Sequence, residues 1–424
     1  MGYKTSPTSC TVQLLALHAL PPATLALCHA LRQEAGRCWS DLVAAHRAAR
    51  EQGVWLTDAE LRALTKGARY ALHSQSVQAL GQQLLANVAT THALRQQERR
   101  AGCEPTAQYP HRTTAFHTVR WKDQAVRVRS GMLVLPNGRH QRELVLPLPA
   151  RYQQRTIRAV ELLWRADHYE LALTVEEAAP PPLRPEGQTA GVDLGEVAIA
   201  ALVTQRGASL VLNGRYLRSC KRLRNKRHST LDAKLARCRN GSRRWRRLKR
   251  RKAQASAKLY RQQRHILHSA SARLVQFAAA EGVRRLVVGD VRDIATRPRK
   301  GSKTNQKLTQ WAHGQLVRYL SYKGQRQGMV VEQIDEAYST RTCSQCGYVH
   351  PVARRRRVLR CTQPGCGALV QRDVNGAANI CSRAVYGQDA RVHAQAITYR
   401  HACAVAPRTR ARKRSAALAV AARR

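Results

Sequence analysis

The stretches Cys343-Ser-Gln-Cys346 and Cys361-Thr-Gln-Pro-Gly-Cys366 place four thiols in two close pairs, joined by a short basic loop. Such pairs are typical of a structural zinc site. Gly347 and Gly367 follow the second thiol of each pair, where a tight knuckle needs a permissive backbone. The alternatives are a chance grouping among the twelve cysteines or a disulfide pair, and the spacing together with the glycines favours zinc. We therefore predict a Zn²⁺ site made by Cys343, Cys346, Cys361 and Cys366.

The charge of the chain indicates its partner. Its 424 residues carry 74 Lys plus Arg against 26 Asp plus Glu, a formal net charge of +48. Such an excess repels itself unless a polyanion offsets it, so nucleic acid is the expected partner and an anionic membrane surface the competing one. We find no apolar run of about 18 residues and no signal-like start, so no membrane association is expected. The cysteines look like metal ligands plus core thiols, which favours a reducing cytoplasm.

The first 180 residues alternate between strand and helix patterns. Residues 10–16 read as a strand, and a helical region runs from Pro22 to about Arg100, with a capping box at Thr57-Asp-Ala-Glu60. From His117 to Glu177 the apolar residues alternate as in strands. This predicts a small β barrel or sheet interrupted by a helical insert. The proline-rich stretch 180–185 marks a domain boundary.

A second domain opens on Gly191-Val-Asp193-Leu-Gly195, an apolar strand that carries an acid. Further strands are expected at 197–203, 208–213, 285–290 and 329–334, with a helix over 310–327. The chain after about Arg391 is basic and lacks periodicity, so we expect it to be disordered.

Residues 215–264 form a basic helical stretch whose only acidic residue is Asp232. Because a solvated helix face usually mixes both signs, a single sign favours a surface that tracks phosphates over a disordered spacer. The residues that we expect to contact nucleic acid are Arg243, Arg244, Arg246, Arg247, Lys249, Arg250, Arg354, Arg355, Arg356, Arg357 and Arg372.

Phosphodiester hydrolysis with two metal ions requires about three carboxylates on neighbouring elements. Two acids of this chain have such a placement. Asp193 lies within an apolar strand and is followed by Gly195, and Asp373 follows the cysteine pairs and precedes a helix. Each has a plain alternative, Asp193 as a turn residue and Asp373 as a helix N-cap. The zinc motif between them favours the catalytic interpretation.

At this point the chain resembles the TnpB family, the transposon-encoded, RNA-guided DNA endonucleases related to type V CRISPR effectors. The resemblance is specific over about 189–385 and looser over 1–180. The segments that carry it are Gly191-Val-Asp-Leu-Gly, the basic helices, Trp311-Ala-His-Gly, Tyr322-Lys-Gly, Ala337-Tyr-Ser-Thr-Arg-Thr-Cys-Ser-Gln-Cys-Gly and Arg372-Asp-Val-Asn-Gly-Ala-Ala-Asn-Ile.

The resemblance implies an α+β multidomain chain. It would consist of a wedge-like β barrel (1–16 and 104–184) with a helical recognition insert (17–103), a RuvC-like nuclease domain with an RNase H fold (185–342 and 367–390), a zinc ribbon (343–366) and a basic tail (391–424).

One position departs from the family pattern. The second acidic residue is usually a glutamate near the end of the strand 285–291, where this chain has Gly289 and then Asp290. Glu336, which follows the strand 329–334, is the best replacement. We therefore expect Asp193, Glu336 and Asp373 to be catalytic, with Asp290 in reserve. The plain alternative for Glu336 is an exposed acid at a strand end.

The implied cofactors are two catalytic Mg²⁺ ions and a structural Zn²⁺. The implied partners are a guide RNA encoded near the gene and double-stranded target DNA, with the protein a monomer on one RNA in a prokaryotic cytoplasm, at the nucleoid when bound to DNA. Three other functions stay open. They are a nuclease-inactive RNA-guided repressor, favoured by Gly289; a transposase, against which the zinc ribbon argues; and a plain zinc-ribbon RNA-binding protein, which leaves the Asp193 motif unexplained.

Overall fold

The fold is described from a computed structural model, for residues 9–67, 69–291, 301, 305–306, 309–351 and 357–403. The chain divides into two compact units, Met1–Ala179 and Pro180–Arg424, which are described separately. Among the residues described, no helix combines the length and the apolar character needed to cross a bilayer.

The first unit contains three long or capped helices and two antiparallel sheets. Its elements are β1 (Ser9–Leu17), α1 (Pro22–Glu51), α2 (Asp58–Leu64), α3 (Ser74–Arg100), β2 (Val119–Lys122), a 3₁₀ turn (Asp123–Ala125), β3 (Arg127–Arg129), β4 (Met132–Leu135), β5 (Leu144–Pro147), α4 (Ala150–Gln153), β6 (Ile157–Trp164) and β7 (Tyr169–Glu177).

The predicted order of strand, helical insert and strands is confirmed in this unit. The first strand pairs with the last in a sheet of order β1-β7-β6-β2, and β3, β4 and β5 form a second sheet. Helix α1 begins with a proline in its first turn, and the capping box between Thr57 and Glu60 is present at the start of α2. Trp121 and Tyr169 are among the largest fully buried side chains of the core that joins helices and sheets.

The second unit is built around one six-stranded sheet. Its elements are β8 (Gln188–Asp193), β9 (Ala198–Thr204), β10 (Ser209–Asn213), α5 (Arg215–Ala236), α6 (Arg243–Ala280), β11 (Val283–Asp290), α8 (His313–Gln325), β12 (Val330–Asp335), β13 (Val358–Arg360), β14 (Leu369–Gln371), α9 (Arg372–Tyr386) and β15 (Ile397–His401).

The strand order of this sheet is β12-β11-β8-β9-β10-β15. Strands β8, β11 and β12 are parallel, whereas β9 runs antiparallel to both β8 and β10. One face packs against α6 and α8, and the other against α9, so the sheet is the middle of three layers. Because side chains alternate along a strand, successive residues of β8 and β11 face opposite helical layers.

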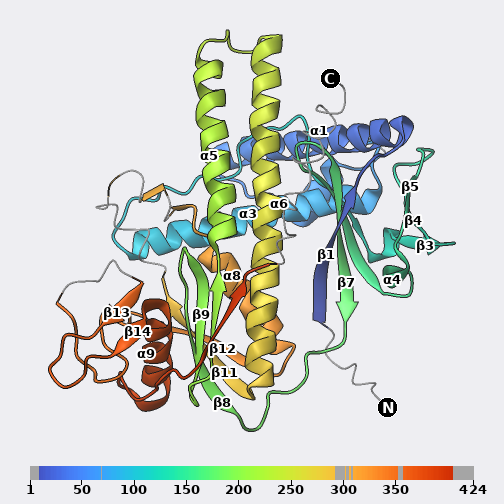
Figure 1. Cartoon of the computed structure of the whole chain (residues 1–424). Helices are drawn as coiled ribbons and strands as arrows, with labels where there is room; N and C mark the ends of the chain where they lie inside the picture. Colours follow the sequence, from blue (N-terminus) through green and yellow to red (C-terminus); the bar gives the residue numbers. More distant parts are fainter. Residues whose placement is uncertain are drawn as a thin grey trace, which may run out of the picture. The chain divides into compact units, whose positions relative to one another are not determined.

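Helices α5 and α6 form an antiparallel hairpin that extends beyond the sheet (Figure 1). The sequence predicted one basic helical stretch over 215–264. The structure divides it at a turn over residues 237–242, and Ser242 caps α6 through the backbone amide of Trp245. Beyond residue 264 helix α6 becomes apolar on one face and covers the sheet, which explains why it continues to Ala280.

The expectation of disorder after residue 391 is wrong for the part of the tail that the structure describes. Ile397–His401 forms β15, parallel to β10 at the edge of the sheet. The strand forms because the backbone groups of β10 pair with it, and hydrophobic periodicity in the sequence does not show such pairing. Ala402 and Cys403, which follow the strand, are buried against the core. Residues 404–424 lie outside the described part.

Candidate active site and zinc ribbon

Three neighbouring parallel strands bring their carboxyl ends to one edge of the sheet. Asp193 is the last residue of β8, Gly289 lies one residue before the end of β11, and Glu336 directly follows β12. Val288 pairs with Val192, and Gly289 pairs with Ile334. The predicted acids Asp193 and Glu336 therefore lie at the same edge, on either side of Gly289.

Gly289 leaves a space that the side chain of Glu336 fills. A Cβ atom on residue 289 would lie 2.5 Å from Oε2 and 3.0 Å from Cβ of Glu336, and 2.9 Å from Cδ1 of Ile380 on α9. Real Cβ atoms do not approach other atoms this closely, so a side chain at 289 and the present position of Glu336 exclude each other. The carboxylate of Glu336 thus lies where the first atoms of a side chain on β11 would project.

Asp290, the reserve candidate, faces the opposite layer. Val288 belongs to the core against α6 and α8, and residue 290 shares its side of the strand. His313, at the start of α8, lies on that side. Burial lowers the pKa of the His313 imidazole, and the nearby carboxylate of Asp290 opposes this fall. Asp290 also raises the pKa of Glu336, so the two acids are neighbours across the strand end.

Asp193 is buried beneath the first turns of α9. Its Oδ2 lies 2.8 Å from where a Cβ atom on Gly376 would be, so only glycine lets the helix come this close to the carboxylate. Asp193 is therefore a buried strand residue and not the turn residue of the plain alternative. Gly376 belongs to the segment that begins with Asp373, which explains structurally why a glycine stands in that motif.

Asp373 lies in the first turn of α9 and is buried. The N-cap is Gln371, whose Oε1 accepts a hydrogen bond from the amide of Val374, so the alternative of Asp373 as N-cap is wrong. The Gln371 amide also donates to Asp373 Oδ2 at 3.1 Å. Two guanidinium groups approach the same carboxylate, Arg357 at 3.4 Å from Oδ2 and Arg372 at 3.4 Å from Oδ1.

The carboxyl groups of Glu336 and Asp373 are close enough to Asp193 to raise its pKa. Burial raises the pKa of Asp193 well above its usual range, the carboxylates of Glu336 and Asp373 raise it further, and Arg372 opposes the rise. Burial, Asp290 and Asp335 raise the pKa of Glu336 to about 7. Glu336 Oε2 is buried and has no hydrogen-bond partner among the described residues. An orphaned acceptor among crowded acids fits a divalent cation, for which oxygen ligands are preferred.

The raised pKa of Glu336 predicts a pH-dependent stability. The folded state holds the proton of the Glu336 carboxyl group more tightly than the unfolded state does. The contribution of Glu336 to stability is therefore complete below its ordinary pKa of 4.5 and is lost as the pH rises through about 7. In buffer without added Mg²⁺ and without a chelator, which would also remove the structural zinc, Glu336→Gln should unfold at a higher temperature than the wild type near pH 8, and the difference should close near pH 5. Scanning calorimetry measures both, with Glu332→Gln on β12 as the control. An equal difference at both pH values would contradict the assignment.

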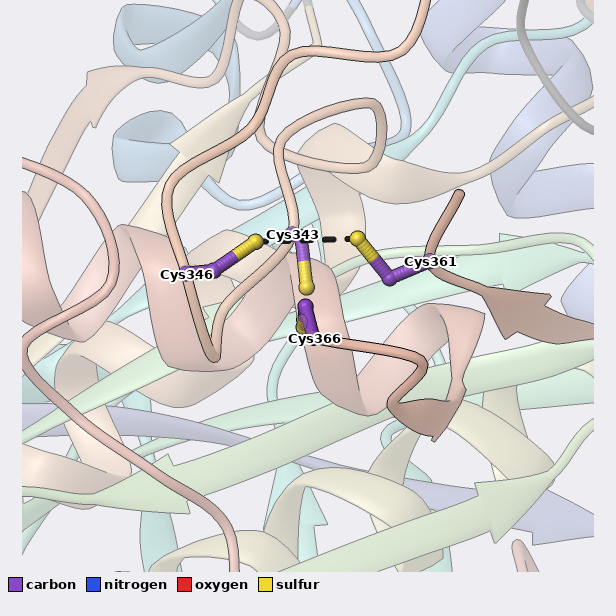
Figure 2. A group of neighbouring side chains, drawn as sticks. All are labelled: Cys343, Cys346, Cys361 and Cys366. Atoms are coloured by element: carbon purple, nitrogen blue, oxygen red, sulfur yellow. Dashed lines mark hydrogen bonds between the residues drawn. The ribbon is translucent and has the colours of Figure 1, made fainter. Parts of the chain in front are cut away.

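The four predicted zinc ligands are brought together, with their sulfur atoms all within 4.8 Å of one another. Figure 2 shows the side chains converging from the two knuckles, with Sγ of Cys346 and Cys361 3.6 Å apart. Tetrahedral zinc with Zn–S bonds of about 2.3 Å separates its sulfurs by about 3.8 Å, so the cluster fits this ion. Four thiolates leave no open position for water, which makes the site structural. As predicted, Gly347 and Gly367 have positive φ angles, 77° and 54°.

Two buried asparagines of α9 connect the loop after Glu336 to the helix that carries Asp373. The amide nitrogens of Asn375 and Asn379 each donate to the carbonyl oxygens of Ser339 and Thr342, at 2.7–3.2 Å. Asn375 Oδ1 also accepts from the amide of Ser344, inside the first zinc knuckle. The sequence analysis missed both residues, although their spacing of four places them on one face of a helix.

Two stretches of the chain match known protein families. Residues 172–295 match the family described as "Probable transposase" (OrfB_IS605), and residues 313–380 match the "Cas12f1-like, TNB domain". The chain belongs to the TnpB family. This family consists of RuvC-like nucleases. No sequence among the curated proteins matches the chain.

Several solved structures are similar to this TnpB-family chain. A Cas12f1–sgRNA–target DNA complex matches with a TM-score of 0.61 at 10% identity, over 85% of this chain and 83% of that one. CasPhi-2 (Cas12j) bound to crRNA has a TM-score of 0.45 at 9% identity, covering 91% and 98% of the two chains. A CRISPR-Cas12f ternary complex has a TM-score of 0.40 at 11% identity, covering 84% and 80%. The first of these shows a mixed α+β, multidomain fold like that of this chain.

The basic residues predicted to contact nucleic acid fall into two groups in this TnpB-family protein. Those of α6 are exposed along the first two turns of the helix, at Arg243, Arg244, Arg246, Arg247, Lys249 and Arg250. The second group lies beside Asp373 and comprises Arg357 and Arg372. Arg354, Arg355 and Arg356 lie outside the described residues.

Proposed function

We propose that this chain is an RNA-guided, Mg²⁺-dependent DNA endonuclease that cuts target DNA next to a short flanking motif. The observation that carries the proposal is the carboxylate of Glu336 in the space left by Gly289, at the same sheet edge as Asp193 and near Asp373. The domain assignment is part of the proposal, with a RuvC-like RNase H fold over 185–342 and 367–390, the ribbon at 343–366, and a wedge-like barrel with a recognition insert before them.

Asp193, Glu336 and Asp373 are the residues that would hold Mg²⁺. When bound, the ions would activate water and neutralise the charge that develops on the phosphate. The chain supplies the rest of the site. Burial keeps bulk water from Asp193 and Asp373, and α9 fixes Asp373 beside Asp193. Arg357 and Arg372 lie where their guanidinium groups can bind a phosphate oxygen once the carboxylate of Asp373 has other partners.

The α5–α6 hairpin supports a nucleic-acid partner in the second unit. Its exposed cations include those at the start of α6. Asp232 is the only acid in the sequence between residues 215 and 264, and it forms an ion pair with Lys252. Phosphate neutralisation by such a surface supplies most of the sequence-independent affinity for nucleic acid. The similar Cas12f1 structure contains a guide RNA and target DNA, which is the arrangement that we propose here.

The first unit also offers a cationic pocket. A cavity of about 580 Å³ is lined by Arg62, Lys66, Arg69 and Arg139, together with the ring of Tyr70. Four cations around one cavity suit a phosphate backbone. This agrees with the proposal that the first unit holds the guide RNA and the DNA duplex.

A nuclease-inactive repressor is the second candidate, because Gly289 removes the acid usual at that position. The position of Glu336 favours the nuclease, since its carboxylate reaches the place from which that acid is missing. A transposase is the third candidate, and products in which DNA strands are joined would support it.

The function is tested by cleavage of a plasmid library in Mg²⁺, using the protein purified with its bound RNA. We expect the wild type to cut at one guide-matched site beside a fixed flanking motif. Asp193→Ala should bind the same target but cut about 1,000-fold more slowly, since losing a metal ligand removes about 4 kcal/mol of transition-state stabilisation.

The other outcomes each reject the proposal. If the wild type binds its target without cutting it, the repressor is the correct assignment. If Asp193→Ala cuts at the wild-type rate, the site lies elsewhere. A protein that carries no discrete RNA would contradict guidance by RNA.

A further inference from the structure

The loop between Glu336 and the first zinc knuckle holds an aromatic ring in an unfavourable backbone conformation. Tyr338 has φ 62° and is 60% exposed to solvent. Bulky residues rarely adopt positive φ, and such strain persists where the surroundings impose it. Glycine would fit this turn without strain, so the turn alone does not account for a tyrosine.

The loop that carries Tyr338 is attached by hydrogen bonds to α9, the helix that carries Asp373. The amides of Asn375 and Asn379 bind the carbonyls on its C-terminal side, and Arg383 Nη1 donates to the carbonyl of Ala337 at 2.7 Å. Arg383 is itself held by Asp389 at 2.6 Å. The backbone that carries Tyr338 is therefore held in place two residues from Glu336.

One cation orients the ring. The guanidinium carbon of Arg341 lies 5.0 Å from the ring centre of Tyr338. Two hydrogen bonds hold the Arg341 guanidinium group in this position. Its Nε donates to the carbonyl of His350 at 3.0 Å and its Nη2 donates to the carbonyl of Pro351 at 2.6 Å. Tyr338 is thus an oriented aromatic ring, backed by a fixed positive charge and open to solvent over most of its surface.

We propose that Tyr338 is a nucleobase-binding residue, which stacks on an unpaired base of the strand being cut, next to the scissile phosphate. The inference rests on the proposed nuclease function and names a contact that the substrate makes. Stacking on an aromatic ring suits any of the four bases, because each has a π face, and Arg341 adds attraction for the adjoining phosphate. A base held two residues from Glu336 fixes the position of its phosphate among the three acids.

The test couples a change in the protein to a change in the DNA. Target duplexes carry one abasic site at each nucleotide beside the mapped cut. An abasic site at the stacked position should slow wild-type cleavage about tenfold, within the range expected for the loss of one stacked base. Tyr338→Ala should lose about the same factor on intact DNA and nothing further on abasic DNA, whereas Tyr338→Phe should keep the wild-type rate.

Two further variants separate stacking from folding. Tyr338→Gly relieves the positive φ, so it should fold at least as stably as the wild type and yet cut as slowly as Tyr338→Ala. Tyr399→Ala removes a tyrosine of similar exposure, 63%, from β15 and should change nothing. If Tyr338→Gly cuts at the wild-type rate, or if abasic DNA slows Tyr338→Ala as much as it slows the wild type, the proposal is overturned.

A second measurement does not depend on cleavage. In Ca²⁺, duplexes with 2-aminopurine at successive positions should show quenching at one position with wild type and Asp193→Ala, but not with Tyr338→Ala. Such quenching by a wild type that does not cut in Mg²⁺ would reject the nuclease function and keep the base-binding site. Cleavage without any Tyr338-dependent quenching would reject the site and keep the function.

Discussion

Replacing Glu336 with glutamine should reduce DNA cleavage about 1,000-fold without weakening target binding, because the amide keeps the shape of the side chain but loses the charge that a metal ligand needs. Single-turnover rates in saturating Mg²⁺ measure the effect. The matched control is Glu332→Gln on the same strand, which breaks only a half-exposed ion pair with Arg285. Such pairs contribute at most about 1 kcal/mol, so this variant should stay within about fivefold of the wild type.

The steric exclusion between residues 289 and 336 allows a sharper version of this test. Gly289→Glu alone should also lose activity, since its Cβ would lie 2.5 Å from Glu336 Oε2 and displace that side chain. Combining Gly289→Glu with Glu336→Ala removes the 2.5 Å contact and returns an acid to the same side of β11, and the remaining close contact of 2.9 Å is with the flexible end of the Ile380 side chain. The double variant should cut at least about tenfold faster than Glu336→Ala, which corresponds to recovering about 1.4 kcal/mol of transition-state stabilisation.

Three results would oppose this assignment. They are wild-type cleavage by Glu336→Gln, a double variant no faster than Glu336→Ala, and loss of cleavage in Asp290→Asn with Glu336→Gln unaffected. The last would make Asp290 the second acid, although its side of β11 faces α8.

Loss of the zinc ion should abolish both the fold of the ribbon and cleavage. Structural zinc sites contribute about 10–16 kcal/mol to the folding of small domains, so Cys343→Ser removes most of what holds the two knuckles together. The effect reaches the acids, because Asn375 binds the amide of Ser344 and also the carbonyl of Thr342. We expect the zinc content to fall from one ion per chain to none, and cleavage to fall to background.

Cys103→Ser is the control, since Cys103 is an exposed free thiol outside the cluster. It should keep one zinc and full activity. Limited proteolysis of Cys343→Ser should cut within residues 343–366 while α9 survives. A zinc-free variant that cuts DNA at the wild-type rate would show that the ribbon and the acids are independent.

Local sequence patterns predicted much of this site, because the cysteine cluster and the strands that carry the acids each have a recognisable pattern in a short stretch of sequence. The cysteine spacing identified the metal cluster, and apolar runs located β8, β11 and β12 to within a few residues. The resemblance to TnpB, together with Gly289 where an acid was expected, predicted Glu336 as the replacement. The parallel order of the three strands then accounts for why residues so distant in sequence meet.

The remaining features depend on tertiary contacts that no local pattern contains. Strand β15 exists because β10 offers an unpaired edge, and Gln371 rather than Asp373 caps α9 because its side chain reaches the amide of Val374. Asn375 and Asn379 look like ordinary polar helix residues until the loop at Ser339 lies against them. Sequence alone could not distinguish the burial of Glu336 from that of any acid at a strand end.

The large excess of positive charge on the α5–α6 hairpin has a consequence for the protein's lifetime in the cell. Like charges along two packed helices oppose the compact state, and a bound polyanion removes that repulsion. Because any partner that binds only the folded state stabilises it by mass action, the supply of the proposed guide RNA would be linked to the stability of the protein. Chains made in excess of their RNA would then be the ones that proteases degrade, so the abundance of this protein would follow the transcription of its RNA.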